Sequence, residues 1–408
     1  MARQTTLIRG ARVWTGVGDT PARSLDMLVE GGRIQALEAR LSTPPGAQVI
    51  DADGLLLLPA FVDGHGHLDK TLWGRPWQPH SAGPTVAERI ANERSLLARL
   101  DHSPQAGSER LLRHLVTRGT TTVRSHVDVG TEVGLSHLHA VLATRERCAD
   151  IATLQLVAFP QGGVGPGAGT LDLLDNAVLE GAEAIGGVDP ATIDGHPTAQ
   201  LDGVFAIASR RGCALDLHLH ELGETGLAAV DAIIERTLSL GLAGRVVISH
   251  AFCLGELAPD RLDPLLARLA KADIAIMSHG PGGGWPRPPV RRLAEHGVRV
   301  FCGSDGVRDA WSPLNTGDML ERAYLVAYVN GLRDDAGLEL ALQMATSRAA
   351  DVLGIEAGTL EAGAPADIVA VQAETAAEAV AAHPPRCWVM RRGQIIARDG
   401  HAAAAPQT

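Results

Sequence analysis

The sequence predicts an α/β fold, a (β/α)8 TIM barrel with a small β-sandwich domain formed by both termini. Three patterns predict it: eight short apolar runs in the middle of the chain, helix-like segments between them, and strand-and-turn patterns at both ends. Strands that alternate with helices indicate parallel β/α units, and eight units over about 300 residues fit a closed barrel. A doubly wound open sheet is the structural alternative. It is less favoured because no G-x-G-x-x-G turn follows the first strand.

The ends of the chain are expected to form the small domain, from residues 1–58 and 359–408. LDMLVEGGRIQAL, residues 25–37, places a Gly-Gly turn between two apolar runs, which is a hairpin signal. ADIVAVQAET and CWVMRRGQIIARDG repeat this style after residue 359.

The middle of the chain, residues 59–358, is expected to be the barrel. Its eight apolar runs cover residues 55–67, 120–129, 152–161, 182–190, 214–221, 245–252, 273–280 and 298–305. Helix-like segments include residues 86–100, 135–149, 226–241 and 339–354.

Composition and charge exclude several classes of protein. The 408 residues are 45% hydrophobic and 20% charged, which is typical of a globular chain. The net charge of −11 argues against a sequence-independent nucleic-acid binder, which needs a basic face. No apolar run approaches the ~20 residues that span a bilayer. The five cysteines are far apart and never form C-x-x-C, so we expect free thiols, a reducing compartment and a cytoplasmic protein without membrane or nucleic-acid partners.

Polar side chains gather where the eight runs end. In a (β/α)8 barrel, these carboxyl ends carry the chemistry. The terminal groups are His65, His67, His126, Asp128, Gln161, Asp189, His218, His220, Glu221, His250, His279 and Asp305. So many metal-competent groups at equivalent positions indicate one shared site.

His65 and His67 form the strongest local signal. Side chains on a strand alternate between its two faces, so H-x-H directs both imidazoles to one side. Neutral imidazoles are ready metal ligands, and His218 and Asp305 add two further donors at strand ends. His126 is better explained as a buried or orienting histidine, and Asp189 as a helix cap before Pro190. The roles of His220, His279 and Lys70 stay open.

Other sites are excluded by missing motifs. The chain has no G-K-S/T of a P-loop, no H-E-x-x-H of a zincin, and no H-x-E…P-C-x-x-C of the cysteine-liganded deaminases. Residues 303–306, GSDG, are not the G-x-S-x-G nucleophile elbow.

Together, PAFVDGHGHLDK, LHLHELGE, ISHAFC and CGSDGVRDAW resemble the amidohydrolase superfamily, over nearly the whole chain. VAFPQ, RSHVDV and the D-x-W of residues 309–311 resemble its cytosine deaminase branch. The chain is also similar to the N-isopropylammelide isopropylaminohydrolases, which remove an alkylamine from an s-triazine. GGVDPAT and SHAFC are closer to that group.

The resemblance implies roles for these residues. One divalent metal ion, Zn²⁺ or Fe²⁺, would be held by His65, His67, His218 and Asp305. Glu221 would shuttle protons, His250 would stabilise the developing oxyanion, and Asp305 could also accept a proton. Gln161, Trp311 and Gly306 would contact the heterocycle.

Two further observations refine this expectation. Binuclear relatives commonly bridge two metals with a carboxylated lysine after the fourth strand, but the only lysines here are Lys70 and Lys271, neither of which fits. A mononuclear site is therefore expected. Cytosine deaminases carry two adjacent acids after the eighth strand, whereas this chain has Asp305 and Gly306, and we expect the glycine to open space.

The expected function is a metal-dependent hydrolytic deaminase of an amino-substituted N-heterocycle, such as a cytosine-like pyrimidine. In it, metal-activated water attacks the amine-bearing ring carbon and ammonia leaves. The alternatives are an N-alkylaminohydrolase acting on an s-triazine such as N-isopropylammelide, and a catalytically inactive relative. A small heterocyclic substrate is the expected partner, and the sequence leaves a homo-oligomer open.

Overall fold

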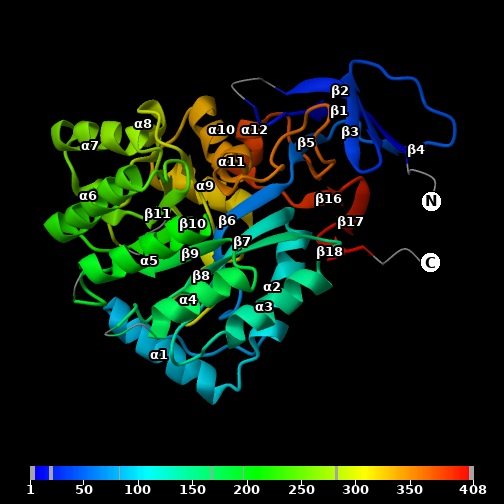
Figure 1. Ribbon diagram of the computed structural model, residues 1–408. Helices are drawn as coiled ribbons and strands as arrows, with labels where there is room; N and C mark the ends of the chain where they lie inside the picture. The colour runs from blue at the N-terminus through cyan, green and yellow to red at the C-terminus, as the bar shows by residue number, and fades with distance from the viewer. Residues whose placement is uncertain are drawn as a thin grey trace.

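The computed structural model describes residues 5–17, 22–81, 83–165, 167, 169–195, 197–280 and 284–403 (Figure 1). Among these residues, a nine-stranded parallel sheet forms the centre, in the order β13-β12-β11-β10-β9-β8-β7-β6-β14. Its strands are β6 (Phe61–His67), β7 (Thr120–Asp128), β8 (Thr153–Phe159), β9 (Ala184–Val188), β10 (Ala214–Leu219), β11 (Val246–His250), β12 (Ala275–Met277), β13 (Val300–Phe301) and β14 (Asp305–Gly306).

The last predicted run of the barrel joins the two ends of this sheet. Its first part, β13, pairs with β12, and its second part, β14, pairs with β6 through Asp305 opposite Gly66. Between them, the Gly64 amide donates to the Cys302 carbonyl at 3.2 Å. The sheet is therefore curled and parallel, which is consistent with the predicted barrel.

Helices follow most of the strands, as β/α units require (Figure 1). They are α1 (Val86–Arg99), α2 (Pro104–Thr117), α3 (Ser136–Arg147), α4 (Gly169–Leu179), α5 (Pro197–Arg211), α6 (Gly223–Ser239), a 3-10 turn η1 (Phe252–Glu256), α7 (Pro259–Lys271), α8 (Val290–Glu295), α9 (Met319–Val329), α10 (Asp335–Met344), α11 (Ser347–Leu353) and α12 (Ala376–Ala382). Within the described part of the chain, none of them has the length and apolarity that crossing a membrane requires.

The predicted helix over residues 339–354 is two helices, α10 and α11. The carbonyl of Met344 accepts from the Cys302 amide, and the carbonyl of Ala345 accepts from the Val62 amide, both at 2.9 Å. These carbonyls bond to the barrel strands instead of continuing the helical ladder, so the helix breaks there.

Strands from both termini form a second nine-stranded sheet (Figure 1, blue and red strands). They are β1 (Thr5–Val13), β2 (Arg23–Glu30), β3 (Arg33–Glu38), β4 (Gln48–Asp51), β5 (Leu56–Pro59), β15 (Ile368–Val371), β16 (Arg386–Arg391), β17 (Gln394–Arg398) and β18 (His401–Ala402). The two halves meet where β15 pairs antiparallel with β5. The predicted run 55–67 is divided between β5 and β6, one strand in each sheet. The division into domains stays a prediction.

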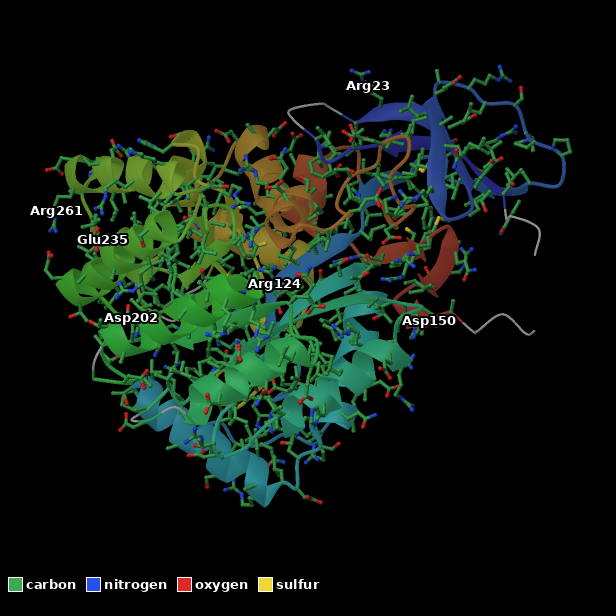
Figure 2. All side chains as sticks on the ribbon, in the orientation of Figure 1. Arg23, Arg124, Asp150, Asp202, Glu235 and Arg261 are labelled. Carbon is green, nitrogen blue, oxygen red and sulfur yellow. The ribbon has the colours of Figure 1, made fainter. Side chains whose placement is uncertain are left out.

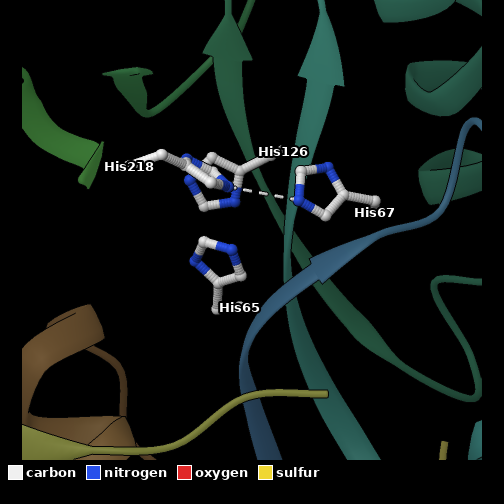
Figure 3. Close-up of side chains that lie close together, drawn as sticks. All are labelled: His65, His67, His126 and His218. Atoms are coloured by element: carbon white, nitrogen blue, oxygen red, sulfur yellow. Dashed lines mark hydrogen bonds between the residues drawn. The ribbon is translucent and has the colours of Figure 1, made fainter. Parts of the chain in front are cut away.

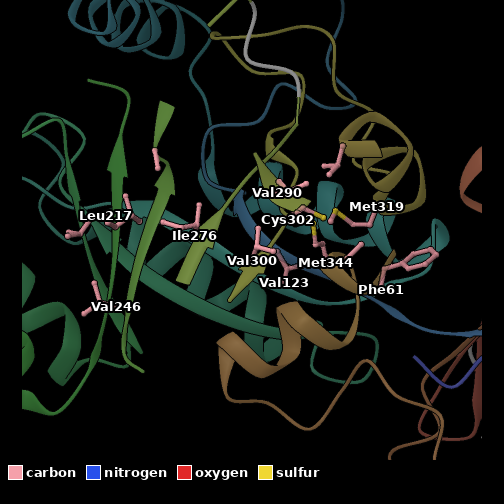
Figure 4. Packing of buried hydrophobic residues seen from close by; sticks show 14 of the residues in the cluster. Phe61, Val123, Leu217, Val246, Ile276, Val290, Val300, Cys302, Met319 and Met344 are labelled. Atoms are coloured by element: carbon pink, nitrogen blue, oxygen red, sulfur yellow. The ribbon is translucent and has the colours of Figure 1, made fainter. Parts of the chain in front are cut away.

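A continuous apolar core lies between the parallel sheet and its helices (Figure 4). Leu217, Ile276 and Val300 on the strands are at most 2% exposed, as are Val290 and Met319 on the helices. The rigid packing of these groups holds the strand ends in fixed positions, and the polar side chains at those ends form the candidate site.

Candidate metal centre

The four predicted ligands meet at the carboxyl ends of three strands. His65 and His67 come from β6, His218 from β10 and Asp305 from β14. Nε2 of His67 lies 3.3 Å from Nε2 of His218 (Figure 3). It also lies 3.3 Å from Oδ1 of Asp305. Nε2 of His65 lies 3.8 Å from the same carboxylate oxygen. Residues up to 240 positions apart in sequence thus form one compact cluster.

The donor set of this cluster fits a divalent cation. His65, His67, His126 and His218 share one group of mutually close ligand atoms, and His65, His218, His250 and Asp305 share another, each within 4.8 Å. Within the described residues, the buried Nε2 of His65 has no hydrogen-bond partner. A buried nitrogen without a partner is costly unless something else binds it, and imidazole with carboxylate suits Zn²⁺ or Fe²⁺.

Burial keeps His65 and His218 of the cluster neutral. Burial, together with the neighbouring imidazoles, holds the pKa of His65 well below its ordinary value, and the same causes act on His218. A neutral imidazole has the lone pair that a metal ligand needs. Any cation that binds here does not have to displace protons from these rings at neutral pH.

A buried network beneath the cluster orients His65. Nδ1 of His65 lies 3.0 Å from Oγ of Ser249, which donates to Oδ1 of Asp216 at 2.6 Å. Arg124, inside the molecule (Figure 2), lies 3.5 Å from the other oxygen of Asp216. Burial raises the pKa of Asp216, but His126, His65 and Arg124 outweigh it and hold the pKa below its usual range. The ionised carboxylate turns Nε2 of His65 toward the cluster.

His126 lies inside the cluster and beside the same aspartate. Its ring centre is 4.1 Å from that of His65, and its Nε2 is 3.5 Å from Oδ1 of Asp216. This position is compatible with the orienting role expected from the sequence.

His250 completes the side of the cluster formed by β11. Its Nδ1 lies 3.1 Å from Nδ1 of His279, and its buried Nε2 has no partner among the described residues. His250 has a φ of 73°, and Asp305 has a φ of 62°. Such left-handed conformations are strained for these residues and are found where function requires a particular side-chain direction.

His220 and Glu221 point in different directions at the end of β10. His220 lies two residues beyond His218, on the same face of the strand, and its side chain lines the cavity beside the cluster. Its Nδ1 lies 2.7 Å from Oδ2 of Asp189.

The carboxylate of Glu221 instead accepts from the backbone amides of Ala191 and Thr192, at 2.9 and 2.7 Å. Glu221 is not among the described residues that line the cavity. Glu221 lies three positions after His218, and in an extended segment such an odd spacing turns the side chain to the opposite side. The proton-shuttle role implied by the resemblance requires a carboxylate that faces the substrate, and in this structure it faces the backbone amides instead. Its catalytic role stays a prediction.

The cavity beside the cluster has a volume of about 430 Å³, within the usual range for a small-molecule site. Its histidine side is formed by His67, His218, His220, His250 and His279. Its apolar surface includes Val86, Ile90, Phe159, Phe252, Trp285 and Leu314. The predicted contacts Gln161, Gly306 and Trp311 also line it.

Lys70 and Gln161 belong to a buried polar wall of this cavity. Nζ of Lys70 lies 3.0 Å from Oδ1 of Asp128 and 3.8 Å from Oε1 of Glu93, and it also donates to Gln161. Nε2 of Gln161 donates to Oε1 of Glu93 at 2.5 Å. Both ends of the Gln161 amide are thus held by protein groups. Lys70, which the sequence left open, is an ion-pairing residue at the site.

The space next to Gly306 is not open, which corrects the expectation from the sequence. A Cβ at this position would lie 1.7 Å from Oδ2 of Asp309. Asp309 reaches back from the following loop and fills the place that a side chain at 306 would take.

The structure brings three acids to the site whose contacts sequence reasoning missed. Asp216 is buried under the cluster, Asp189 contacts His220, and Glu93 comes from α1. Asp189 was interpreted as a helix cap. Only Asp216, in the alternating run ALDLHLHE, carried a usable signal, because it shares the face of His218.

Comparison with known proteins agrees with this geometry. The Amidohydrolase family matches residues 48–397. The crystal structure of N-isopropylammelide isopropylaminohydrolase from Burkholderia multivorans is 45% identical, with a TM-score of 0.92, over 98% of this chain and 100% of that one.

Two further relatives have lower sequence identity to this chain. N-isopropylammelide isopropyl amidohydrolase of Pseudomonas sp. (strain ADP) is 31% identical over 92% of this chain and 94% of its own length. The structure of 5-methylcytosine deaminase from Klebsiella pneumoniae with phosphonocytosine is 25% identical, with a TM-score of 0.83, over 98% of this chain and 100% of that one. Both relatives named from the sequence motifs are thus found.

Proposed function

Because the chain belongs to the amidohydrolase family, we propose that it hydrolyses the bond between an N-heterocycle and an amino substituent, and that the substrate is an N-alkylamino-s-triazine such as N-isopropylammelide. The observation that carries the proposal is the match to the Burkholderia multivorans structure, at 45% identity over both whole chains. Members of one family at this similarity commonly keep the chemistry of the site.

In this proposal His65, His67, His218 and Asp305 hold one divalent cation, Zn²⁺ or Fe²⁺. Bound there, the cation would supply Lewis-acid activation of water at neutral pH. Lys70 supports a single-metal site, because its Nζ is already paired with Asp128 and Glu93.

The residues around the cluster supply the proton transfers. Asp305 is placed to take a proton from the attacking water. We assign the proton delivered to the leaving amine to Nε2 of His220, because Asp189 binds the other ring nitrogen at 2.7 Å and fixes the direction of the ring. A carboxylate that orients an imidazole in this way makes its free nitrogen a directed acid or base. Nε2 of His250 is placed to hydrogen-bond the oxygen that adds to the ring.

The apolar part of the cavity favours an alkylamine leaving group. Ile90 and Val86 of α1 face the cavity, as do Trp311 and Leu314 of the loop after β14. A branched alkyl group in contact with such a surface is removed from water, at about 25 cal/mol per Å² of apolar area. A substrate that releases ammonia has no alkyl group to contact this apolar surface.

A second candidate is the release of ammonia from a cytosine-like pyrimidine. The similarity to the 5-methylcytosine deaminase structure favours it, as do the VAFPQ and D-x-W motifs, which resemble the cytosine deaminase branch. In that reaction Glu221 is the candidate proton shuttle and would have to turn toward the cavity.

One experiment separates these candidates. Protein of measured zinc and iron content is incubated with N-isopropylammelide, cytosine and 5-methylcytosine, and isopropylamine and ammonia are quantified. We expect isopropylamine from the triazine. Ammonia from the pyrimidines alone would favour the second candidate, and no release from metal-loaded protein would contradict both.

The remaining expectations belong to the same proposal. Catalysis would reside in residues 59–358, with the terminal sheet as a β-sandwich domain. The enzyme would work in the cytoplasm on a small heterocycle, without nucleic-acid or membrane partners.

A further inference from the structure

Asp309 places a buried carboxylate in the substrate cavity. It lies in the loop after β14, is 6% exposed and lines the cavity together with Asp305 and His67. Its Oδ1 accepts from the backbone amides of Trp311 and Ser312, at 2.8 and 2.9 Å. These bonds fix the carboxylate in one direction.

Gly306 is the reason that this carboxylate can reach its position. A Cβ at 306 would lie 1.7 Å from Oδ2 and 2.6 Å from Cγ of Asp309. Gly306 is not among the glycines with positive φ, so the backbone does not require a glycine here. The space that the glycine leaves is occupied by Oδ2, directly after the metal-ligand position Asp305.

The second oxygen of Asp309 has no hydrogen bond from any of the described residues, whereas the first has two. Burial and the neighbouring Asp305 carboxylate raise the pKa of Asp309, whereas His67 acts in the opposite direction, and Glu93 is a second acid close by. Because Asp309 lines the cavity, a ligand there that brings an N–H would supply the donor that this oxygen does not receive from the protein.

We propose that Oδ2 of Asp309 accepts a hydrogen bond from a ring N–H of the substrate. This inference rests on the proposed function and specifies its substrate class: oxo-substituted N-heterocycles that carry a lactam N–H. Rings with an unprotonated nitrogen or an N-alkyl group at this edge would be rejected, because two acceptors would then face each other. Asp309 is thus a specificity-determining residue, and Gly306 makes room for it.

The test uses Asp309→Asn in the metal-loaded protein. Asparagine keeps the oxygen that accepts from residues 311 and 312 but replaces the second oxygen by a donor. Two probes are compared by calorimetry in mildly acidic buffer: the fully oxo-substituted s-triazine, which has three ring N–H groups, and its N,N′,N″-trimethyl derivative, which has none.

We expect the wild type to bind the N–H ring more tightly, and Asp309→Asn to weaken this binding by about 10- to 100-fold, in line with a charged hydrogen bond. Binding of the trimethyl ring should change by less than threefold. The metal content and unfolding temperature should stay unchanged, whereas a purely structural role would lower the latter. Asp335→Asn, an exposed residue on α10, is the matched control.

Gly306→Ala provides a second, independent measurement. Its methyl group must displace the Asp309 carboxylate, so we expect a similar loss of binding to the N–H ring, and little further loss when Asp309→Asn is added.

The outcomes separate this inference from the proposed function. Equal binding of the N–H ring by wild type and Asp309→Asn, with turnover intact, overturns the inference alone. Binding that depends on Asp309, without release of alkylamine from N-isopropylammelide, supports the inference and contradicts the proposed reaction. A wild type that binds neither ring overturns the inference, and the release of isopropylamine then decides the proposed function separately.

Discussion

Replacing Lys70 by methionine should destabilise the protein, because it removes the positive charge from the buried polar wall of the cavity. The ammonium group is buried, 3.0 Å from Oδ1 of Asp128 and 3.8 Å from Oε1 of Glu93. Lys70→Met keeps much of the side-chain volume and removes the only cation that ion-pairs with these two acids among the described residues. Both carboxylates then lack a counter-ion in a region that water barely reaches.

The size of the effect follows from these distances. At 3.8 Å and an effective dielectric constant of about 20, the pair between Lys70 and Glu93 is worth roughly 4 kcal/mol. Removing one partner of a buried ion pair typically destabilises a protein by about 3–5 kcal/mol. For a chain of 408 residues, about 1.2 °C per kcal/mol gives a fall of roughly 4–6 °C in unfolding temperature.

Glu93→Gln should have opposite effects on stability in the wild type and in the Lys70→Met variant, which tests the ion-pair explanation. Alone, it should destabilise the protein less than Lys70→Met does: Lys70 keeps Asp128 as a partner, and burial raises the pKa of Glu93 to about 7, so the cost of burying its charge offsets much of the attraction. In the Lys70→Met background it should raise stability, because it removes an unpaired buried charge. Comparing the double variant with the two single variants thus measures the interaction energy between Lys70 and Glu93.

Scanning calorimetry on the four proteins at equal metal content measures these changes. Lys271→Met, the other lysine of the chain, lies exposed at the end of α7 and should shift the unfolding temperature by less than 1 °C. A fall of less than 2 °C for Lys70→Met would refute the reasoning. So would a further fall when Glu93→Gln is added to it.

Three other predictions concern the cluster and its neighbours. His67→Ala should reduce bound zinc and iron, measured by elemental analysis, to below a tenth of the wild-type content, and unchanged occupancy would remove His67 from the ligand set. Ser249→Ala should weaken metal affinity about 10- to 100-fold in a chelator titration, because it releases Nδ1 of His65; an unaltered affinity would show that the ring is oriented by other contacts. Asp189→Asn should lower kcat for N-isopropylammelide by about 10²–10⁴-fold with metal content unchanged. Glu221→Gln should lower it less than tenfold, and the reverse order of these two losses would return the proton shuttle to Glu221.

The clustering of the candidate metal ligands could be predicted from local sequence because strand periodicity has few alternatives. His65 and His67 must share a face if they lie on one strand, and His218 must enter the same space if its strand belongs to the same closed sheet. The structure brings these side chains together, and the terminal strands also join one sheet as expected. The predicted helix over 339–354 is wrong as a single element, since its break depends on hydrogen bonds to residues far away in sequence.

The substrate side of the cavity could not be predicted in the same way. Asp189 looks like a helix cap in GGVDPAT, yet its carboxylate binds Nδ1 of His220, 31 positions away. Glu93 sits in an ordinary amphipathic helix, and only the packing of α1 brings it to Lys70. Gly306 suggested empty space because a sequence does not show which neighbour fills the place of an absent side chain.

Groups on the barrel strands and groups on the surrounding loops and helices should vary differently within the family. Ligands on strands depend on sheet geometry, and the sheet is shared with relatives at TM-scores of 0.92 and 0.83 despite identities of 45% and 25%. We therefore expect the His/Asp cluster to set the class of reaction, which in this family is the hydrolysis of a carbon–nitrogen bond. Groups such as Asp309 and Glu93 come from a loop and a helix whose sequence can change without moving a strand. The choice of ring and leaving group should follow these groups, and exchanging the loop after β14 between relatives should transfer ring preference while leaving metal content unchanged.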